Sequence, residues 1–248
     1  MSQRACIITP DSVLPKGCVQ RRIRVSPTRP KALLSWSSGK DSAWALHVLR
    51  ERGEVEVAGL LTTINQAANR VAMHAVRECL LDVQAASLGL SLVKVLIPSP
   101  CSNEEYESAM GRAIETARGD GVTKMAFGDL FLEDIRRYRE DKLALTGIEP
   151  LFPIWGRDTT ALAHQMVESG LRGVLTCVDP KQLDPAFCGR IFDAEFLEDL
   201  PDGVDPCGEH GEFHTFVYDG PMFDSPVPVR RGPVEERDGF VFADVLMG

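Results

Sequence analysis

The 248-residue sequence has no long apolar run. No stretch approaches the roughly 18 to 20 consecutive apolar residues that a membrane-spanning helix needs. The first thirty residues also lack the apolar segment that a secretory signal peptide requires. We therefore expect neither a membrane protein nor a secreted protein, and the cytoplasm is the default location.

Closely spaced cysteine pairs are absent as well. The seven cysteines are scattered along the chain, and none are spaced as C-x-x-C. An odd number without a pairing pattern argues against a disulfide framework, and the lack of clustered thiols argues against a structural zinc site. The pattern is typical of a protein from a reducing compartment.

Positive charge is scarce in most of the chain. The formal net charge is −9 at pH 7, and affinity for nucleic acid depends on Lys and Arg, so broad nucleic-acid binding is not expected. Binding of a small anionic ligand by a few local groups is still compatible with this net charge. Residues 1–30 differ, because they carry six Lys and Arg side chains against the single acid Asp11. We expect a disordered basic tail there, with a functional arm or an organelle-targeting segment as alternatives.

Beyond residue 30, strand-like and helical patterns alternate. The short apolar runs KALLSW, VAGLLTTI, LSLVKVLIP, VTKMAFG, LFPIW and RGVLTCV are separated by helical stretches. Strands that are apolar almost throughout and alternate with helices predict a mostly parallel sheet that is covered on both faces. The expected helices cover residues 42–52, 70–89, 102–118, 132–146 and 159–169.

Two of the expected helix starts carry capping signals. Ser102 lies three positions before Glu105, and Asp158 precedes TTALAHQM, so each side chain offers an oxygen to free amides of the first turn. After residue 179 the alternation stops, and Pro, Gly and Asp become frequent. We therefore expect a doubly wound α/β domain over residues 31–180 and a smaller C-terminal substrate or lid lobe over residues 181–248.

The run SWSSGKDS, which joins the first strand to the first helix, has the composition of a phosphate-binding loop. Small side chains let the backbone approach a phosphate, and the free amides and dipole of the following helix attract the anion. The run is not a Walker A loop, because Leu34 and Asp41 stand where that pattern needs Gly and Ser or Thr. An ordinary turn rich in Ser and Gly is the alternative. The candidate ligands are Ser35, Ser37, Ser38, Gly39, Lys40, Asp41 and Ser42.

A second dense cluster lies in VDPCGEHGEFHTF, at residues 204–216. Glu209, His210, Glu212 and His214 fall within six positions on a glycine-broken turn, so several acid–base groups can converge there. Zinc binding is one alternative, although H-x-x-x-H on a broken turn lacks the helical H-E-x-x-H arrangement. An exposed charged turn without a role is another alternative.

Both clusters resemble motifs of one enzyme family. The first resembles the PP-loop of the N-type ATP pyrophosphatases, S-G-G-x-D-S, with Ser38 in place of the first Gly. The second is similar to the string D-x-C-G-E-x-G-E-[FY]-H-T of the diphthine–ammonia ligases in that superfamily. The runs FGDLFLEDIRRYRE, GIEPLFPIWGRDT and FCGRIFDAEFL extend the match over residues 31–223. Two long, distant motifs in the family's order are more specific than either motif alone.

The resemblance implies an ATP-dependent amide ligase with a PP-loop, HUP-like nucleotide-binding domain. Such enzymes use ATP and Mg²⁺ to convert a carboxylate into an acyl-adenylate with release of pyrophosphate. Ammonia then forms the amide and AMP is released. The family's best-known product is diphthamide, on a histidine of translation elongation factor two, whereas a role in cobalamin salvage is suggested for some relatives. The resemblance therefore leaves two candidate acceptors, diphthine on the elongation factor and a small molecule.

Carried over by position, the resemblance implies roles for single residues. The loop from Ser37 to Ser42 would hold the phosphates, with Lys40 and Asp41 acting in catalysis and Asp41 also holding magnesium. At the ends of the second and fourth strands, Leu61, Thr62 and Gly128 would border the adenine. Asp129, which follows Gly128, would contact magnesium or the ribose. The distal turn would place Glu209, Glu212 and His214 over the reacting centre, to position the acceptor or to take a proton from ammonium. A helix cap is the alternative for Asp129, and a strand position is the alternative for His214.

Two other functions fit parts of the sequence. A tRNA sulfurtransferase would share the adenylation chemistry, but it needs a reactive cysteine pair, for which Cys177 and Cys207 are the candidates. A nucleotide sensor without turnover would use ATP or AMP to order the C-terminal lobe. The cluster of Arg136, Arg137 and Arg139 is expected to form a solvated helix face. The sequence does not indicate the oligomeric state.

Overall fold

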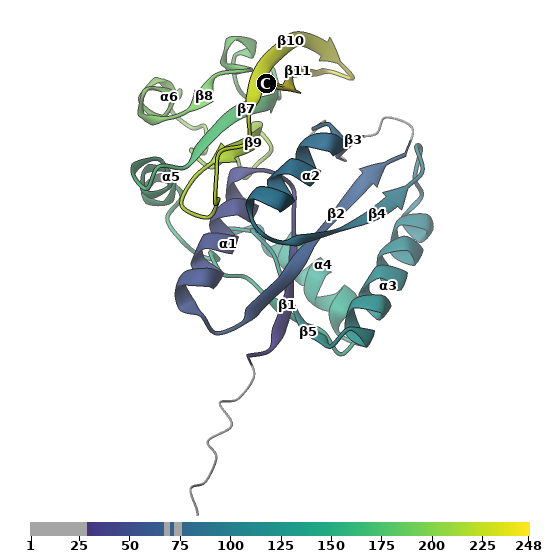
Figure 1. Cartoon of the computed structure of the whole chain (residues 1–248). Helices are drawn as coiled ribbons and strands as arrows, with labels where there is room; N and C mark the ends of the chain where they lie inside the picture. Colours follow the sequence, from purple (N-terminus) through teal and green to yellow (C-terminus); the bar gives the residue numbers. More distant parts are fainter. Residues whose placement is uncertain (1–28, 67–69, 72–75) are drawn as a thin grey trace, which may run out of the picture.

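The computed structural model describes residues 29–66, 70–71 and 76–248. Two β-sheets form the frame of these residues, and the chain completes the first sheet before it enters the second (Figure 1). The expected basic tail lies outside the described residues, apart from Arg29 and Pro30. Within the described part, no helix is both long enough and apolar enough to cross a membrane.

The first sheet confirms the predicted α/β domain. Its strands follow the order β3-β2-β1-β5-β6, and β4 also pairs with β2. Every pairing is parallel except the one between β2 and β3. The strands are β1 (Lys31–Ser35), β2 (Glu56–Asn65), β3 (Arg70–Val71), β4 (Ser91–Ile97), β5 (Val122–Ala126) and β6 (Glu149–Leu151).

Helices cover both faces of this sheet. Leu46 of α1 and Leu80 of α2 belong to one buried cluster, whereas Ala109 of α3 and Leu143 of α4 belong to another on the opposite face (Figure 1). Such winding brings the carboxyl ends of the strands to one edge, where ligands of open α/β sheets bind. The helices are α1 (Lys40–Arg52), α2 (Glu78–Ser87), α3 (Asn103–Gly119) and α4 (Glu133–Leu143).

Both predicted helix caps are confirmed. The hydroxyl of Ser102 accepts a hydrogen bond from the N–H of Glu105 at 3.2 Å, and the Glu105 carboxylate accepts one from the N–H of Ser102 at 2.9 Å. This is a capping box at the start of α3. Asp158 likewise caps α5 (Thr159–Glu168) through a bond from the N–H of Ala161 at 2.8 Å.

One predicted helix starts too early. The helix expected over residues 70–89 is α2, which begins only at Glu78, and Arg70–Val71 forms strand β3 instead. The apolar residues in RVAMHAV fit a strand as well as a helix, so the pattern alone did not reveal the break.

The second sheet is antiparallel, and it contains a strand that the pattern placed in the first. Strand β7 (Arg172–Val178) pairs antiparallel with β8, β9 and β11, and it is buried from Gly173 onward. The prediction that RGVLTCV lies in the parallel sheet is therefore wrong. A strand that is covered on both faces is apolar throughout in either kind of sheet, so burial does not reveal direction. The other elements of this lobe are the 3₁₀ turn η1 (Pro185–Phe187), β8 (Ile191–Phe192), α6 (Ala194–Asp199), β9 (Phe213–Asp219), β10 (Val229–Arg237) and β11 (Phe240–Met247).

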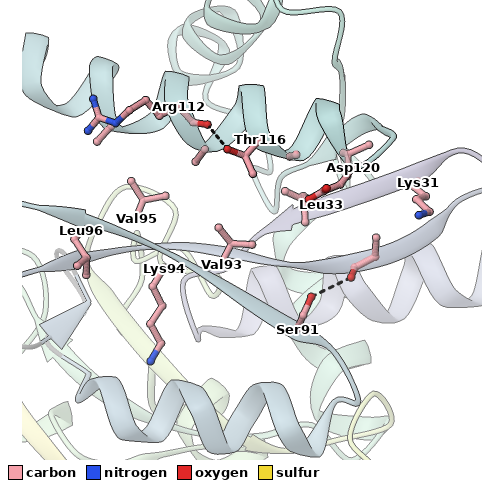
Figure 2. A pocket seen from close by; sticks show the side chains of 15 residues that line it. Lys31, Leu33, Ser91, Val93, Lys94, Val95, Leu96, Arg112, Thr116 and Asp120 are labelled. Atoms are coloured by element: carbon pink, nitrogen blue, oxygen red, sulfur yellow. Dashed lines mark hydrogen bonds between the residues drawn. The ribbon is translucent and has the colours of Figure 1, made fainter.

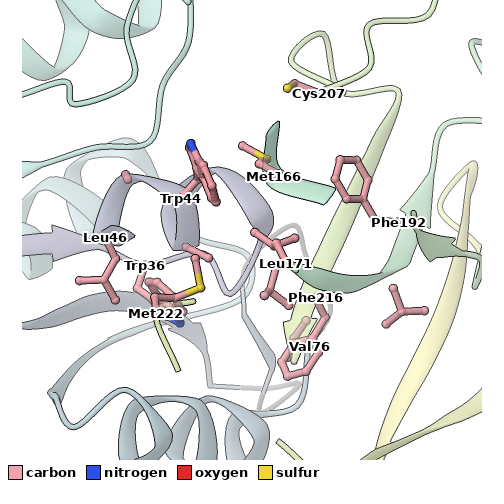
Figure 3. Close-up of a cluster of buried hydrophobic side chains, with 14 of the residues drawn as sticks. Trp36, Trp44, Leu46, Val76, Met166, Leu171, Phe192, Cys207, Phe216 and Met222 are labelled. Carbon is pink, nitrogen blue, oxygen red and sulfur yellow. The ribbon is translucent and has the colours of Figure 1, made fainter. Parts of the chain in front are cut away.

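The two sheets divide the chain between β6 and β7. We therefore propose a lobe boundary between Leu151 and Arg172, in place of the one expected at residue 180. One hydrophobic core nevertheless spans both lobes, and it includes Trp44 of α1 together with Phe192 of β8 and Phe216 of β9 (Figure 3). Each fully buried large apolar side chain contributes about 1.5 to 3 kcal/mol. The lobes are thus held together as one packing unit.

Candidate active site

The run SWSSGKDS forms the turn between β1 and α1, at the carboxyl edge of the first sheet. Strand β1 ends at Ser35 and α1 begins at Lys40. We call residues 35–42 the phosphate loop. Ser38 has a φ of 73°, in the left-handed region that favours glycine. Ser38, which stands in place of the PP-loop pattern's first Gly, therefore adopts a conformation that glycine adopts without steric cost.

The phosphate loop forms one wall of a cavity of about 260 Å³. A second wall is the segment after β5. A third is formed by residues 205–212, which we call the acidic turn, together with the start of β9. Segments that are far apart in the sequence thus meet at one edge of the sheet. Of the predicted site residues, the cavity is lined by Ser35, Ser37, Gly39, Lys40, Asp41, Ser42, Gly128, Asp129, Glu209 and His214.

Lys40 is buried in the wall of this cavity, with 2% of its surface exposed. Its ammonium donates hydrogen bonds to the Asp41 carboxylate at 2.9 Å and to the carbonyl of Cys207 in the acidic turn. Its backbone N–H donates to the hydroxyl of Thr215 on β9 at 3.0 Å. Burial opposes the charge, but Asp41 and the other nearby acids outweigh it, and the pKa of Lys40 is raised. Lys40 is therefore a permanent cation at the phosphate loop.

Asp41 is the second charged group of the loop. Burial raises the pKa of Asp41, and the Lys40 ammonium opposes that rise. Its Oδ2 accepts from Lys40, whereas its Oδ1 is buried and has no hydrogen-bond partner among the described residues. A buried polar atom is unfavourable until a ligand or water satisfies it, and carboxylate oxygens are what Mg²⁺ prefers. Asp41 therefore fits the role of a magnesium ligand.

Gly128 lets the segment after β5 pack directly against the phosphate loop. A Cβ atom at this position would lie 2.8 Å from the carbonyl carbon of Asp41 and 2.9 Å from the amide nitrogen of Ser42. The Ser42 hydroxyl donates to the carbonyl of Gly39 at 3.0 Å and lies 3.2 Å from the hydroxyl of Ser37. The first turn of α1 is therefore closely packed on both sides.

Glu209 joins the acidic turn to the first lobe. Its Oε1 accepts a hydrogen bond from the N–H of Leu130 at 2.8 Å. Burial raises the pKa of Glu209 to about 7, and the carboxylates of Asp41 and Asp129 add to that rise while the Leu130 hydrogen bond and Lys40 oppose it. A carboxyl group that titrates near neutrality can both give and take a proton. Glu209 is thus the strongest acid–base candidate in the cavity.

Asp205 fixes the shape of the acidic turn. Its carboxylate accepts hydrogen bonds from the N–H groups of Cys207 at 3.0 Å and Glu209 at 3.1 Å. The N–H of Asp205 donates to Oε1 of Glu212 at 3.1 Å. Glu212 is 2% exposed, does not line the cavity, and has no partner for Oε2 among the described residues. The structure therefore brings Glu209 to the cavity, whereas Glu212 supports the turn from within.

The two histidines of the distal cluster differ in position. His214 lies on strand β9, as its alternative interpretation proposed, and it also lines the cavity, where its role stays a prediction. Burial, together with the smaller effect of the Lys40 charge, lowers the pKa of His214 to about 4, which leaves the ring neutral at pH 7. His210 packs edge-on against the ring of Phe131, with 5.2 Å between centroids, and does not line the cavity.

Sequence comparisons relate this site to a known enzyme family. Models for the N-terminal and C-terminal domains of diphthamide synthase match residues 30–147 and 158–242. A diphthine–ammonia ligase from Danio rerio is 30% identical over 211 residues, which cover 75% of this chain and 81% of the relative. The chain belongs to the diphthine–ammonia ligase family. Those of Bos taurus and Homo sapiens are each 26% identical over 233 residues, covering 84% of this chain and 86% of the relative.

Two adenine contacts implied by the diphthine–ammonia ligase resemblance lie away from the cavity wall. Leu61 and Thr62 of β2 are 2% and 3% exposed, and neither lines the cavity. The carbonyl of Leu61 accepts a hydrogen bond from the N–H of Trp36 at 2.8 Å. The hydroxyl of Thr62 is buried without a partner in the described part of the chain. Their place beside the adenine of a diphthine–ammonia ligase stays a prediction.

The cavity of this diphthine–ammonia ligase family member also contains a residue that was expected on a solvated face. Arg139 forms two hydrogen bonds with the Asp129 carboxylate, at 2.6 and 3.1 Å, and its guanidinium lies 4.4 Å from the centroid of the Phe127 ring. Because α4 has Leu132 at its N-cap, Asp129 does not cap that helix. The expectation of a solvated face is wrong for Arg139, because it pairs with a carboxylate that sequence spacing did not connect to it.

Arg136 departs from the same expectation. Its guanidinium lies 4.8 Å from the ring centroids of both Phe152 and Trp155, so it packs on aromatic faces. Thr215 and Phe213 line the cavity as well, and neither was a candidate. Thr215 stands inside the family string, and its role appears only through its bond to Lys40.

A larger cavity, of about 580 Å³, lies between β4 and α3 (Figure 2). Val93 and Val95 of β4 face Arg112 and Thr116 of α3 across it, and the Thr116 hydroxyl donates to the carbonyl of Arg112 at 2.9 Å. Lys94 points to the opposite side, where it pairs with two carboxylates of α2. The phosphate loop and the acidic turn both border the smaller cavity, so we assign the candidate active site there.

Across the described residues, no three His, Cys, Asp or Glu side chains gather in a way that could hold a metal ion. The zinc interpretation of the distal cluster therefore gains no support from this part of the chain. Magnesium differs, because it is commonly bound by one or two carboxylates together with the phosphates of a nucleotide. Asp41 beside the phosphate loop suits that arrangement.

Proposed function

We propose that this chain is an ATP-dependent, AMP-forming amide ligase that acts as a diphthine–ammonia ligase. The observation that carries the proposal is the meeting of Lys40 and Glu209 in one cavity. Lys40 is a permanent cation on the phosphate loop, and Glu209 is a carboxyl group with a pKa raised to about 7 on the opposite lobe. The Lys40 ammonium can bind phosphates, and the Glu209 carboxyl group can take a proton from ammonium. The curated relatives are named for joining ammonia to diphthine, which supports the same chemistry.

In the first step, an oxygen of the acceptor carboxylate attacks the α-phosphorus of ATP. The bond from that phosphorus to the bridging oxygen breaks, and pyrophosphate leaves. The Lys40 ammonium and the free amides at the start of α1 stabilise the negative charge, with Lys40 exchanging the Cys207 carbonyl for a phosphate oxygen. Magnesium neutralises phosphate charge when it is bound, and Asp41 Oδ1 is the atom that fits it.

In the second step, ammonia attacks the carbonyl carbon of the acyl-adenylate. The bond from that carbon to the phosphate oxygen breaks, AMP leaves, and the nitrogen loses a proton to become the amide. Ammonium is the dominant form at neutral pH and is no nucleophile, so a base must first remove a proton. Glu209 is the group placed to take it. The acidic turn also forms one wall of the cavity, and so restricts the access of water to the adenylate.

The thiols argue against tRNA sulfurtransfer as the function. The Cys207 thiol donates to the carbonyl of Thr159 at 3.4 Å, and burial raises its pKa. Burial likewise raises the pKa of Cys177 to about 12. Thiols that stay protonated at neutral pH are poor nucleophiles. A reactive cysteine pair, which that chemistry needs, is therefore disfavoured.

The test supplies the purified protein with ATP, Mg²⁺, nitrogen-15 ammonium and elongation factor two that carries diphthine. Mass spectrometry then follows the label and the appearance of AMP. We expect one labelled amide on the elongation factor for each AMP. Label in a small molecule from cell extract, together with AMP, would retain the ligase and change the acceptor. ATP binding with neither label nor AMP would contradict the proposal and favour a sensor.

A further inference from the structure

Gln84 is a fully buried amide in α2, whose other buried residues are apolar. A buried amide is unfavourable unless its hydrogen bonds are made. Its Oε1 accepts from the indole N–H of Trp36 at 3.0 Å, and its Nε2 donates to the carbonyls of Ser38 at 3.2 Å and Val217 at 2.6 Å. Because an indole N–H can only donate, these contacts fix the orientation of the amide.

The partners of Gln84 belong to two of the segments that form walls of the candidate active site. Trp36 and Ser38 belong to the phosphate loop, and Val217 belongs to β9, the strand that brings Thr215 to the cavity. The N–H of Val217 also donates to the carbonyl of Ser38 at 2.9 Å. Gln84, Ser38 and Val217 thus form a closed set of hydrogen bonds between loop and strand. Trp36 anchors this set in the buried cluster of Figure 3.

Ser38 needs this support because of its backbone conformation. Its φ of 73° is unfavourable for a residue with a side chain. Its hydroxyl is buried without a hydrogen-bond partner among the described residues, so the side chain does not hold it in place. Its carbonyl, in contrast, receives one hydrogen bond from Gln84 and one from Val217. The carbonyl is therefore the group through which the left-handed conformation is held.

We propose that Gln84 is a positioning residue for the phosphate loop. It holds Ser38 in the left-handed conformation and thereby sets the affinity of the loop for the phosphates of a nucleotide. Gln84 does not line the cavity, so it acts through Ser38 and touches no phosphate. The inference rests on the proposed function, because it takes the loop to be the phosphate site.

The test measures binding of inorganic pyrophosphate and of adenosine by calorimetry, for the wild-type protein and for Gln84→Met. Methionine matches the length of glutamine and favours a helix, but it leaves the Ser38 carbonyl without the Gln84 donor. We expect pyrophosphate affinity to fall roughly tenfold or more, since all three buried hydrogen bonds of the Gln84 amide are lost. Adenosine carries no phosphate, so its affinity should change by less than about twofold, because its contacts are independent of the phosphate-binding groups of the loop.

Arg50→Met is the matched control for loosened packing between the lobes. The guanidinium of Arg50 in α1 donates to the carbonyls of Met222 at 2.7 Å and Leu88 at 2.6 Å, away from the phosphate loop. This variant should lower the melting temperature and leave pyrophosphate affinity unchanged. If Arg50→Met weakened pyrophosphate binding as much as Gln84→Met does, Gln84 would be an ordinary packing residue and the inference would be wrong.

Ser38→Gly in the Gln84→Met background provides a rescue. Glycine adopts the left-handed conformation without a steric penalty, so it should restore part of the lost pyrophosphate affinity. Gln84→Glu is the alternative variant if Gln84→Met folds poorly. Its carboxylate repels the two carbonyls when ionised and can donate one hydrogen bond when protonated, so its pyrophosphate affinity relative to wild type should rise as pH falls.

The outcomes separate the two proposals. Wild-type binding of pyrophosphate with an unchanged affinity in Gln84→Met and Gln84→Glu would overturn the role of Gln84 and leave the proposed function intact. Failure of the rescue would mean that Gln84 does not act through Ser38, and it would also overturn the inference. A wild-type protein that bound neither pyrophosphate nor ATP would overturn the proposed function and the inference together.

Discussion

The phosphate loop and the acidic turn face each other across one cavity, but they are built in opposite ways. The loop is a strand-to-helix connection that offers a cation, hydroxyls and helix amides. The acidic turn contains neither strand nor helix, and the Asp205 carboxylate holds its backbone at the N–H groups of Cys207 and Glu209. The loop is thus shaped by regular secondary structure, and the turn is shaped by its own side chains.

Each of the two segments also depends on the other lobe for its final contact. The acidic turn and β9 hold Lys40 through the Cys207 carbonyl and the Thr215 hydroxyl. In return, the first lobe holds Glu209 through the N–H of Leu130. The candidate phosphate loop is therefore defined by a short local sequence, whereas the position of Glu209, the candidate acid–base group, requires both lobes.

Lys40→Met tests the loop side and should have the largest effect. Loss of a charge that stabilises the reacting phosphate should lower the rate of AMP formation by about 10³-fold. The rate is measured with saturating acceptor and ammonium. Lys94→Met removes another lysine that pairs with carboxylates of α2, away from the cavity, and should change nothing. A loss of less than tenfold for Lys40→Met would show that the cradle works through its amides alone.

Glu209→Gln tests the acidic turn. The amide oxygen can keep the hydrogen bond from Leu130, but the proton acceptor is lost, so amide formation should fall by about 10² to 10³-fold. ATP affinity should stay within about twofold of wild type, because the phosphates contact the loop. Glu235→Gln, at an exposed position on β10, is the matched control.

The pH dependence of the rate sharpens this test of Glu209. Its pKa is raised to about 7, so the base form appears as pH rises through neutrality. The wild-type rate should therefore increase across this range, and the Glu209→Gln rate should not follow it. An identical pH profile in both proteins would assign the proton transfer to another group.

Variants of Glu212 distinguish a structural role in the acidic turn from a role in the reaction. Glu212→Ala removes the acceptor for the N–H of Asp205 and should lower the free energy of unfolding by about 1 to 3 kcal/mol. Glu212→Gln retains an acceptor oxygen and should keep both stability and turnover near wild type. Urea unfolding and AMP formation measure the two effects. Loss of turnover in Glu212→Gln with intact ATP binding would instead place Glu212 in the reaction.

The smallest predicted effect is a pH-dependent change in the free energy of unfolding, and it also comes from Glu209. Its pKa is about 7 in the folded protein and 4.5 for an unperturbed glutamate, so the unfolded chain releases its proton first. Stability from this group is complete below pH 4.5 and is lost as pH rises through 7. We compare the free energy of unfolding of Glu209→Gln with that of the wild type at each pH. From pH 4.5 to pH 8 this difference should shift by about 1 to 2 kcal/mol in favour of the variant, a figure reduced for solvent screening of the partly exposed side chain. Urea unfolding at the two pH values measures it, and an equal difference at both would contradict it.

The parts of the fold that the sequence predicted correctly depend on neighbours along the chain. The capping box of Ser102 and Glu105 is visible because its two members are three residues apart. Strand β7 was misplaced because an apolar run reports burial, whereas its direction depends on pairing with β9, about forty residues later. Element type therefore followed from local pattern, and sheet membership did not.

The same division holds in the candidate active site. Residue types were enough to find Lys40 and the acidic turn, because cations and clustered carboxylates have specific chemical uses. They were not enough to separate Glu209 from Glu212, since the direction of each depends on which backbone amide it binds. Gln84 gave no signal at all, because a single glutamine in a helix looks like a surface residue until its three partners surround it.

The bond between the Lys40 amide and Thr215 has a consequence for protein engineering and for inheritance by recombination. A chimaera that joins the first lobe of this chain to the second lobe of a distant relative would combine two halves of a shared hydrophobic core that come from different proteins. It would also place a foreign strand against the loop, at the point where the main chain of Lys40 finds its acceptor. The loop and β9 therefore form one unit for exchange, and a crossover that separates them changes both the core and the contact at Lys40.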